Sequence, residues 1–452
     1  MLTSPLYKAS PVPVQEALLS GRAWLRRQLR ERGRFKGYLD EALRTQWLGD
    51  AEMEHYQQER LTAIIAHSRR SVAFYRERDR LPPREGDSMR DYLRRLPLLS
   101  KDEVRRANAS FVSNNTSLPV FKGSTSGTTG MPLSVSQDIN AICRENAFIR
   151  RQMIWAGWKP GERRAWIRGD MVVPIDQRGG AHWRMNRAEN NLMMSSYHLS
   201  EDSAAGYIEA LQRFSPRIVH AYPSSIAFLA NWLEAHSSHY GGDGLTGIIT
   251  SSETLEPEQK RLIESAFGCR VFDWYGQFER VAAIGTCEHG TLHVLSDYSM
   301  VELLPCGEGQ HEIVGTGFNN EVMPLIRYRT GDFVVADPQV GRCACGRAFP
   351  VVQRLVGRQD TYVTLPDGRK VGRLDHIFKN VRGLYESQIY QPSIDCVRLR
   401  VVPTPAFDNA EEARLLEGAR HRLGSGVRIE VERLAHIPRT ATGKFLAVIS
   451  DV

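Results

Sequence analysis

The sequence predicts an α/β protein with a large N-terminal domain, rich in parallel sheet, and a small α+β domain at its C-terminal end. Two observations lead to this prediction. Short apolar strands alternate with amphipathic helices in the middle of the chain, and a separate strand-helix-strand pattern fills about the last hundred residues. With 452 residues the chain is long enough for two or three domains.

The middle of the chain carries strand and helix signals in alternating order. Buried strands are predicted at 218–221, 247–250 and 271–272, with helices at 225–234 and 257–267 between them. This alternation favours parallel pairing, and ligands of parallel sheets bind beyond the carboxyl ends of the strands. We therefore expect a binding site at that edge of the sheet.

The C-terminal region has its own pattern of strands at 396–402 and 427–431 around a helix at 411–423. The sequence turns polar near Gly357 and Arg358, which indicates a boundary. The predicted domains are an arginine-rich helical extension at 1–50, a large domain at 51–357 and a small domain at 358–452.

Composition limits the class of protein. The net charge is +7, and no apolar run of about 18 residues or signal peptide is evident, so we expect a cytoplasmic protein without a membrane span. Basic residues crowd one early stretch: Arg22, Arg26, Arg27, Arg30, Arg32, Arg34 and Lys36. A nucleic-acid or membrane patch is one interpretation; the solvated face of an amphipathic helix is the favoured one.

The segment from Ser124 to Pro132 reads "STSGTTGMP", which suits neither helix nor strand. Glycines and hydroxyls with Lys122 just ahead could surround phosphates, although the lysine of a P-loop is missing. Four later stretches accompany it: "WYGQFE" at 274–279, "IRYRTGD" at 326–332, "LVGRQD" at 355–360 and "IPRTATGK" at 437–444. In this order the five stretches resemble the motifs of the adenylate-forming superfamily of acyl-CoA synthetases, luciferases and peptide-synthetase adenylation domains. "LPLLSKDEVR" and "AYPSSI" are similar to the phenylacetate-CoA ligase branch, and most of all to its CapK-type members.

The resemblance implies a large domain that binds ATP and a carboxylic acid, and a mobile small domain that carries a catalytic lysine. Lys444, Glu279 and Thr128 are the implied catalytic residues, and Glu279 would hold Mg²⁺. Asp360, beside Arg358, would be the hinge. The implied ATP- and AMP-binding residues are Ser124, Thr125, Ser126, Gly127, Thr128, Thr129, Gly130, Ser252, Glu253, Tyr275, Gly276, Asp332 and Arg358.

The implied reaction is activation of an acid to an acyl-adenylate with release of pyrophosphate, followed by acyl transfer to coenzyme A. Transfer to an amine, a hydroxyl or a carrier-protein thiol is the alternative, and a basic zinc-containing nucleic-acid-binding protein is a remote one. Tyr222 and Trp274, together with Trp155 and Trp158, are aromatic side chains that could line a substrate pocket. Such a pocket would favour an aromatic acid. The sequence leaves the acid, the acceptor and the oligomeric state open, a homodimer included.

Three of the seven cysteines form a possible zinc site. Cys343 and Cys345 are a C-x-C pair, and Cys287 lies upstream in "CEHGTLH". Three thiolates and one imidazole suit tetrahedral Zn²⁺, with His293 as the fourth ligand and His289 as the alternative. Such a site would be structural because no position stays open; reduced buried thiols are the other interpretation.

Overall fold

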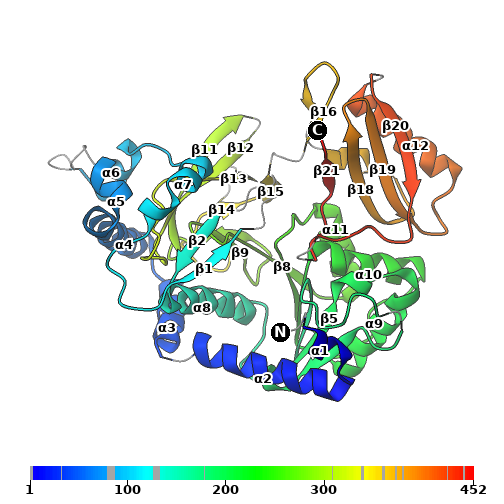
Figure 1. Cartoon of the computed structure of the whole chain (residues 1–452), viewed down its shortest axis with the longest axis horizontal. Helices are drawn as coiled ribbons and strands as arrows, with labels where there is room; N and C mark the ends of the chain where they lie inside the picture. Colours follow the sequence, from blue (N-terminus) through cyan, green and yellow to red (C-terminus); the bar gives the residue numbers. More distant parts are fainter. Residues whose placement is uncertain are drawn as a thin grey trace. The chain divides into compact units, whose positions relative to one another are not determined.

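The structure is a computed structural model (Figure 1), and it describes residues 4–31, 33–78, 87–125, 133–177, 179–307, 309–336, 341–358, 362–371, 374–378, 381–424, 426–440 and 443–452. The chain folds into two compact units. The first contains Met1–Ala23, Pro160–Val271 and Arg358–Val452, and the second contains Trp24–Lys159 and Phe272–Gly357. Residues 358–452 thus share a unit with 160–271. The division at residues 50 and 357, and the mobility of the small domain, stay predictions.

The first unit is built on a sheet whose order is β7-β6-β3-β5-β4. Its strands are β3 (Arg164–Arg168), β4 (Trp183–Asn186), β5 (Asn191–Ser195), β6 (Ile218–Ala221) and β7 (Gly247–Ser251). Strand β3 pairs in parallel with both β5 and β6, β6 pairs in parallel with β7, and β4 is antiparallel to β5. After β3 the chain forms β4 and β5 on one side of that strand and then β6 and β7 on its other side. The strand order therefore reverses at β3.

Three helices pack on this sheet and bury its apolar strands: α9 (Glu201–Phe214), α10 (Pro223–Ala235) and α11 (Pro257–Phe267), drawn in green in Figure 1. Every residue of β6 and β7 is buried, as expected for parallel strands covered by helices. Proline at the first turn of α10 and of α11 suits a position whose backbone N–H has no helical partner. The α/β class and the alternating pattern predicted from the sequence are confirmed.

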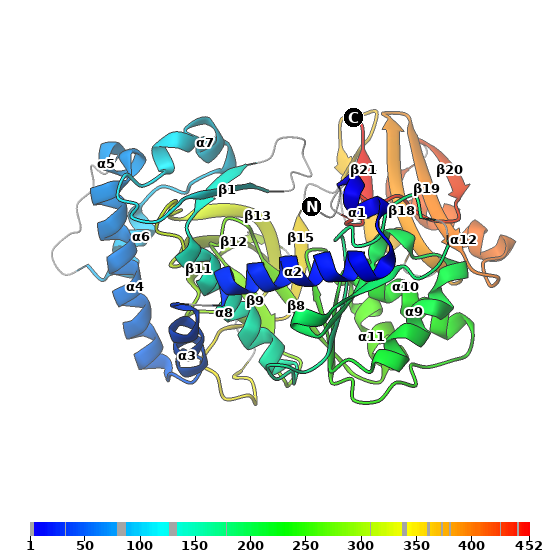
Figure 2. The same cartoon turned by 60° about the horizontal axis from the view of Figure 1, so that its bottom comes forward.

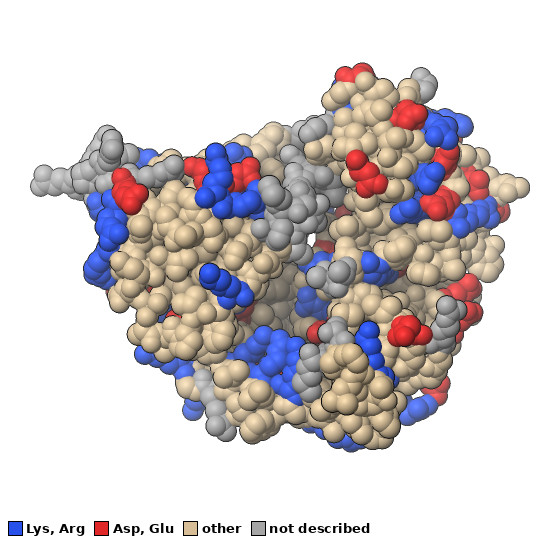
Figure 3. All heavy atoms as spheres, in the orientation of Figure 1, with Lys and Arg blue, Asp and Glu red and all other residues tan. Residues whose placement is uncertain are grey.

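The C-terminal part of the same unit is a sheet of order β20-β19-β18-β21 with α12 against it. The elements are β18 (Leu384–Ser393), β19 (Cys396–Pro403), α12 (Asn409–Leu423), β20 (Arg428–Arg433) and β21 (Val448–Ser450), preceded by β16 (Val363–Thr364), β17 (Lys370–Val371) and η4 (Leu374–Ile377). Ion pairs such as Arg398–Glu430 and Arg400–Glu432 cross from β19 to β20. Basic and acidic side chains are accordingly mixed over this region in Figure 3.

The N-terminal helices are α1 (Pro5–Ala9) and α2 (Val12–Arg30), shown in blue in Figure 2. In the first unit the Tyr7 hydroxyl donates to the carbonyl of Val172 at 2.7 Å, and Arg184 Nε donates to Gln15 Oε1 at 2.6 Å. Tyr7 is almost fully buried. The beginning of the chain is therefore packed into this unit through Tyr7 and Gln15. These contacts do not involve the arginines that crowd the early part of the sequence.

The second unit begins within α2 and contains α3 (Phe35–Thr45), α4 (Asp50–Ser71), α5 (Ala73–Arg78), α6 (Met89–Arg95), α7 (Lys101–Arg106), η1 (Asn108–Phe111) and α8 (Ile139–Trp155). One hairpin is β1 (Phe121–Ser124) with β2 (Ser134–Gln137). The remaining strands are β8 (Arg270–Gly276), β9 (Ala283–Thr286), β10 (Leu292–Val294), β11 (Ser299–Gly307), β12 (Gln310–Gly317), β13 (Tyr328–Val335), β14 (Val351–Val352) and β15 (Arg354–Arg358). They form ladders of order β8-β9-β10-β14 and β11-β12-β13-β15. Among the described residues no helix has the length and apolarity needed to span a bilayer.

A buried ion pair joins α8 of the second unit to the segment before β11. The side chains of Arg151 and Asp297 are 1% and 0% exposed, and Arg151 Nη2 lies 3.1 Å from Asp297 Oδ1. The Thr45 hydroxyl donates to the same carboxylate at 2.6 Å, and Arg151 also donates to the carbonyl of Ala42 at 2.8 Å. The pair therefore ties α3, α8 and residue 297 together.

Replacing Asp297 with Asn leaves the Arg151 guanidinium buried without a counter-charge. We expect the free energy of unfolding to fall by about 3–5 kcal/mol, read as a shift of the urea midpoint. Asp50→Asn is the matched control, because Asp50 pairs with Arg342 on the exposed surface, and it should change stability by at most about 1 kcal/mol. Equal effects of the two substitutions would contradict the assigned importance of the buried pair.

Candidate functional site

The hairpin of β1 and β2 holds the two ends of the predicted phosphate loop in the second unit. Thr125 N–H donates to the carbonyl of Leu133 at 2.9 Å, and Leu133 N–H donates to Thr125 Oγ1 at 3.0 Å. A Cβ at Gly123 would lie 2.3 Å from the ring of Phe278. The base of the hairpin therefore packs against Phe278, the residue that precedes Glu279 in the sequence. Ser124 pairs with Ser134. The predicted residues Ser126, Gly127, Thr128, Thr129 and Gly130 lie outside the described residues.

Tyr275, near the end of β8, and Asp332, within β13, meet in the second unit. The Tyr275 hydroxyl donates to Asp332 Oδ2 at 2.9 Å, and Gln277 donates to that hydroxyl. Burial and the adjacent Asp332 carboxylate raise the pKa of Tyr275 well above its ordinary value, so the phenol stays a donor. Gly276, the last residue of β8, is exposed. The structure thus brings together two of the residues that the sequence analysis predicted to bind ATP and AMP.

Glu279 follows β8 and is 5% exposed. The Tyr328 hydroxyl donates to its Oε1 at 3.1 Å, and no other described residue hydrogen-bonds to this carboxylate. A buried carboxylate with one oxygen left over fits a hard cation that takes its other ligands from phosphate oxygens. The donor chemistry at Glu279 is therefore compatible with the predicted Mg²⁺.

Lys444 lies in the first unit, on a segment that contacts the 160–271 region. Gly443 has φ +73°, and a Cβ there would come within 2.3 Å of the Gly169 Cα, so both its conformation and its close approach require glycine. The Ser196 hydroxyl donates to the Gly443 carbonyl at 3.4 Å. Thr440 N–H donates to the Lys444 carbonyl at 2.9 Å, and Lys444 N–H donates to Thr440 Oγ1 at 3.0 Å. These contacts fix the backbone that carries the lysine.

Glu253 anchors the other side of the lysine. Its Oε1 accepts from Phe445 N–H at 2.6 Å and its Oε2 accepts from Ser224 N–H at 3.0 Å. Ser224 is in the first turn of α10, where backbone N–H groups lack helical partners and favour a negative charge. Burial raises the pKa of Glu253, and the two N–H donors act in the opposite direction. We call the residues Gly443, Lys444 and Phe445 the lysine segment.

Arg168, His220 and Ser252 form a polar cluster at the carboxyl ends of β3, β6 and β7. Arg168 Nη2 donates to Ser252 Oγ at 2.6 Å, and Arg168 Nη1 lies 3.4 Å from His220 Nε2. The guanidinium lies 4.9 Å from the ring centre of Tyr222 and 5.0 Å from that of Trp166. Sequence reasoning predicted Tyr222 and Ser252 but missed Arg168; the one available signal was an arginine at the end of an apolar strand, just before Gly169.

The other predicted residues are distributed over both units. Trp274 is buried in β8, and because side chains alternate along a strand it faces away from Tyr275. Trp155 Nε1 donates to Gln46, and Arg150 covers the ring of Trp158, so both rings belong to the interior of the second unit. Arg358 is the last residue of β15. Asp360 and the side chain of Arg358 lie outside the described residues.

The cysteine and histidine ligands converge in the second unit. The candidate ligand atoms of Cys287, His293, Cys343 and Cys345 all lie within 4.8 Å of one another. Cys287 Sγ is 3.7 Å from Cys343 Sγ, and Cys345 Sγ is 3.4 Å from His293 Nε2. A zinc tetrahedron with ordinary bond lengths has S–S edges of about 3.8 Å and S–N edges of about 3.6 Å. The spacing therefore fits Zn²⁺, and His289, the alternative ligand, is exposed.

Hydrogen bonds around the cluster orient its ligands. His293 Nδ1 lies 3.1 Å from the carbonyl of Phe349, which leaves Nε2 as the atom that faces the sulfurs. Burial opposes ionisation of the Cys343 thiol, but hydrogen bonds with Thr291 and with the Cys345 backbone N–H lower its pKa to about 6. Burial raises the pKa of Cys287, and that of Cys345 to about 11. A bound cation would favour the thiolate at all three positions.

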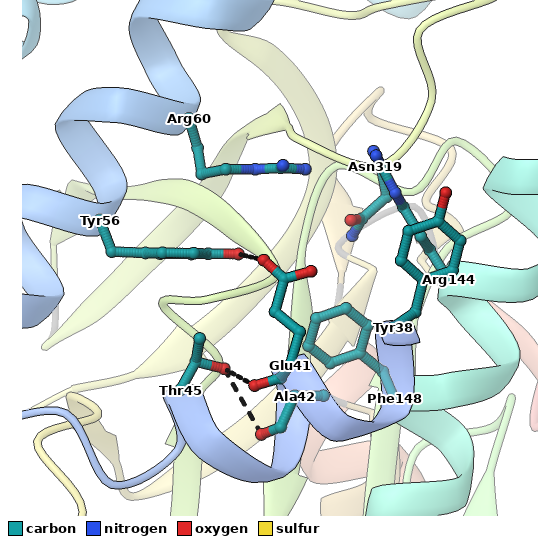
Figure 4. Close-up of a pocket in the computed structure, with 9 residues that line it drawn as sticks. All are labelled: Tyr38, Glu41, Ala42, Thr45, Tyr56, Arg60, Arg144, Phe148 and Asn319. Atoms are coloured by element: carbon teal, nitrogen blue, oxygen red, sulfur yellow. Dashed lines mark hydrogen bonds between the residues drawn. The ribbon is translucent and has the colours of Figure 1, made fainter. Parts of the chain in front are cut away.

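A small cavity lies elsewhere in the second unit, between α3, α4 and α8 (Figure 4). The Tyr56 hydroxyl donates to Glu41 at 3.0 Å, and Arg60 and Arg144 both donate to the carbonyl of Phe318, at 3.1 and 3.2 Å. The space accommodates about one water molecule. None of the residues predicted to bind ATP or metal lines it.

The fold is that of adenylate-forming CoA ligases. The chain is similar to 2-hydroxyisobutyryl-CoA ligase in the postadenylation state in complex with R3-HIB-AMP, with a TM-score of 0.66 over 90% of this chain and 91% of that chain at 21% identity. The structure of the same ligase in complex with 2-HIB-AMP gives a TM-score of 0.65 at 20% identity. The predicted fold class is thereby confirmed.

The chain is also similar to Protein CapK of Staphylococcus aureus, with 23% identity over 457 residues that cover 99% of each chain. Residues 363–451 match the family described as the CapK C-terminal domain. Phenylacetate-coenzyme A ligase of Escherichia coli strain K12 is 24% identical over 333 residues, 68% of this chain and 72% of the ligase. The predicted resemblance to the phenylacetate-CoA ligase branch and to CapK is confirmed.

Glu253→Ala removes the acceptor that holds Phe445 N–H. We expect the hydrogen-exchange protection of this amide to fall roughly ten- to hundredfold, since a hydrogen bond to a charged group contributes about 1.5–3 kcal/mol. Glu253→Gln keeps one acceptor oxygen and should lose less. Exchange is read by mass spectrometry of peptides that cover the lysine segment, with Glu209→Ala on the exposed face of α9 as control. Unchanged protection in Glu253→Ala would show that this contact does not anchor the segment.

Proposed function

We propose that this protein activates a carboxylic acid with ATP, forming an acyl-adenylate and releasing pyrophosphate, and then transfers the acyl group to coenzyme A. The adenylate-forming ligase fold and the similarity to CoA ligases support this function. The observation that carries the proposal is the anchored lysine segment. It brings the backbone of Lys444 to Gly169 and Glu253, which follow β3 and β7 at the carboxyl edge of the parallel sheet.

Adenylation solves two chemical problems of a free carboxylate. The negative charge repels nucleophiles, and oxide is a very poor leaving group. Attack of the carboxylate oxygen on the α-phosphorus forms a C–O–P mixed anhydride and breaks the bond to pyrophosphate, after which AMP is the leaving group. Negative charge accumulates around the α-phosphorus in the transition state, so a cation placed there accelerates the step. Lys444 is proposed to supply that cation.

Residues of the second unit are proposed to bind the nucleotide. Tyr275 stacks on adenine, and Asp332 accepts from the ribose hydroxyls; the Tyr275–Asp332 hydrogen bond fixes the carboxylate for this task. The hydroxyl- and glycine-rich loop, which begins after the hydrogen-bonded Thr125, donates to the phosphates. Glu279 would hold Mg²⁺, which when bound neutralises phosphate charge.

The acid is proposed to be aromatic, because Tyr222 is a buried ring beside the polar cluster of Arg168. Coenzyme A is the proposed acceptor on the strength of the similarity to CoA ligases. Transfer to an amine, a hydroxyl or a carrier-protein thiol is the alternative outcome. A panel of acids screened by ATP–pyrophosphate exchange, followed by addition of CoA, amines or alcohols, separates these acceptors.

Lys444→Ala should reduce acid-dependent ATP–pyrophosphate exchange by roughly 10²-fold or more, because the cation acts on charge that develops only in the transition state. Thiolysis of a preformed acyl-adenylate by CoA should be spared, since the thiol attacks the acyl carbon and the α-phosphorus is not the reacting centre of that step. Lys260→Ala, which removes an ion pair on α11, is the control and should leave both half-reactions at the wild-type rate. Equal loss of both half-reactions in Lys444→Ala would refute the assigned role.

We also propose that Cys287, His293, Cys343 and Cys345 bind one structural Zn²⁺ per chain. Four protein ligands leave no open position for catalysis. Metal analysis should find stoichiometric zinc in the wild type and in His289→Ala, and strongly reduced zinc in Cys343→Ser. Chelation should lower the thermal midpoint of the wild type because binding stabilises the folded state. Absence of zinc from the wild type, or equal loss in His289→Ala, would end the proposal.

A further inference from the structure

Arg168 occupies the position of a parallel sheet where ligands are bound most often. It is the last residue of β3, and the strand order reverses at β3 because β5 lies on one side and β6 on the other. Open parallel sheets bind ligands outside the carboxyl ends of the strands at such a reversal. The neighbouring residue Gly169 touches Gly443 of the lysine segment. Arg168 therefore lies beside the proposed site of adenylation.

The charge of Arg168 has no counter-ion among the described residues. Its polar contacts are to neutral groups that include Ser252 Oγ and His220 Nε2, and it also lies against the rings of Trp166 and Tyr222. Two nearby carboxylates have other partners. Asp170 accepts from Trp166 Nε1 at 2.7 Å, and Glu253 accepts from Ser224 and Phe445. A half-buried guanidinium that cannot lose its proton and lacks a carboxylate is a site for an external anion.

The neighbours of Arg168 hold it in place without neutralising it. Ser252 has φ +73°, an unfavourable conformation for serine that places its hydroxyl on the guanidinium. His220 is buried, which lowers its pKa well below the ordinary value, so the ring stays neutral beside the arginine. The Ser251 hydroxyl lies 3.1 Å from His220 Nε2 and Arg168 Nη1 lies 3.4 Å from it. Arg168 is thus a cation whose position is restrained by neutral polar side chains.

The persistence of charge distinguishes two anions that Arg168 could bind. The reacting carboxylate loses its charge when the acyl-adenylate forms, so a permanent cation fixed on it would stabilise the substrate more than the transition state. A second anionic group on the acid keeps its charge through both half-reactions. A rigid arginine that binds such a group lowers the energy of substrate, transition state and adenylate alike, and selects the acid.

We propose that Arg168 is a specificity-determining residue that binds a second anionic group, such as a carboxylate, on the acid substrate, so that the preferred acids are dianions. This inference rests on the proposed function and specifies its substrate class. With the ring of Tyr222 beside the guanidinium, an aromatic ring that bears both the activated side chain and the second acid group combines the two features of the site.

Matched pairs of acids test the proposal. Phenylacetate and 4-carboxyphenylacetate differ in one carboxylate, and hexanoate and adipate are the aliphatic pair. Binding is followed without ATP through tryptophan emission, because Trp166 lies against Arg168; Trp166→Phe identifies this signal. Acid-dependent ATP–pyrophosphate exchange gives kcat and KM for the same acids. Arg168→Gln removes the charge, Arg168→Lys keeps a charge without the planar fork, and Arg213→Gln, on the exposed face of α9, is the matched control.

The wild type and Arg213→Gln should prefer the dianion of each pair by roughly ten- to hundredfold in binding, the range expected for a charged hydrogen bond. The ratio of dianion to monoanion affinity should fall to about one in Arg168→Gln and recover in part in Arg168→Lys. In the exchange assay the substitutions should change KM rather than kcat. Equal weakening of both acids in Arg168→Gln, a wild-type preference for the monoanion, or no binding of any dianion would overturn the proposal. If only monoanions support ATP–pyrophosphate exchange, the adenylation proposal stands and the proposed role of Arg168 fails. If dianions bind through Arg168 but no acid supports exchange, the proposed role of Arg168 in binding stands and the adenylation proposal fails.

Discussion

The anchoring of the lysine segment on Glu253 is the interaction on which the proposed site in the first unit depends. A single buried carboxylate accepts from the first turn of α10 and from Phe445, so it satisfies an N–H group that the helix cannot and at the same time holds the segment that carries Lys444. Gly443 makes the second contact, against Gly169, where no side chain would fit. Together with the packing of Phe445 on the apolar core, these contacts hold the lysine segment at a defined position in the first unit.

Two kinds of cation stand beside this anchor, and their chemistry suits different tasks. Lysine is a point charge on a flexible stem, which can approach a phosphate oxygen and withdraw from it. Arginine is a rigid planar donor, and Arg168 is further restrained by Ser252 and by two aromatic rings. A movable charge serves a step in which charge appears and disappears. A restrained charge serves recognition of a group that stays ionised throughout.

The second unit is organised by contacts of another kind. Its helices are tied by the buried Arg151–Asp297 pair, whereas the segment near residue 345 is held to β10 through thiols and an imidazole. Both arrangements place polar or ionisable groups in the interior, where each group must have its partner. The hydrogen bond between Tyr275 and Asp332 follows the same rule close to the proposed nucleotide site. Rigidity in this unit therefore comes from satisfied polar groups as well as from the apolar core.

The sequence alone determined the local elements and the chemical character of the protein. The strand Ile218–Ala221 and the helix Pro257–Phe267 have the predicted bounds, because their apolar periodicity and terminal residues are local properties. The ordered motifs were likewise sufficient for the adenylate-forming resemblance. Only the tertiary structure decided that Glu253 holds Phe445, 192 residues away, and that His293 rather than exposed His289 joins the cysteines. The position of Arg168 at the reversal of strand order was also invisible in the sequence, because the order of strands in a sheet depends on how helices cross over it rather than on any residue in the strand.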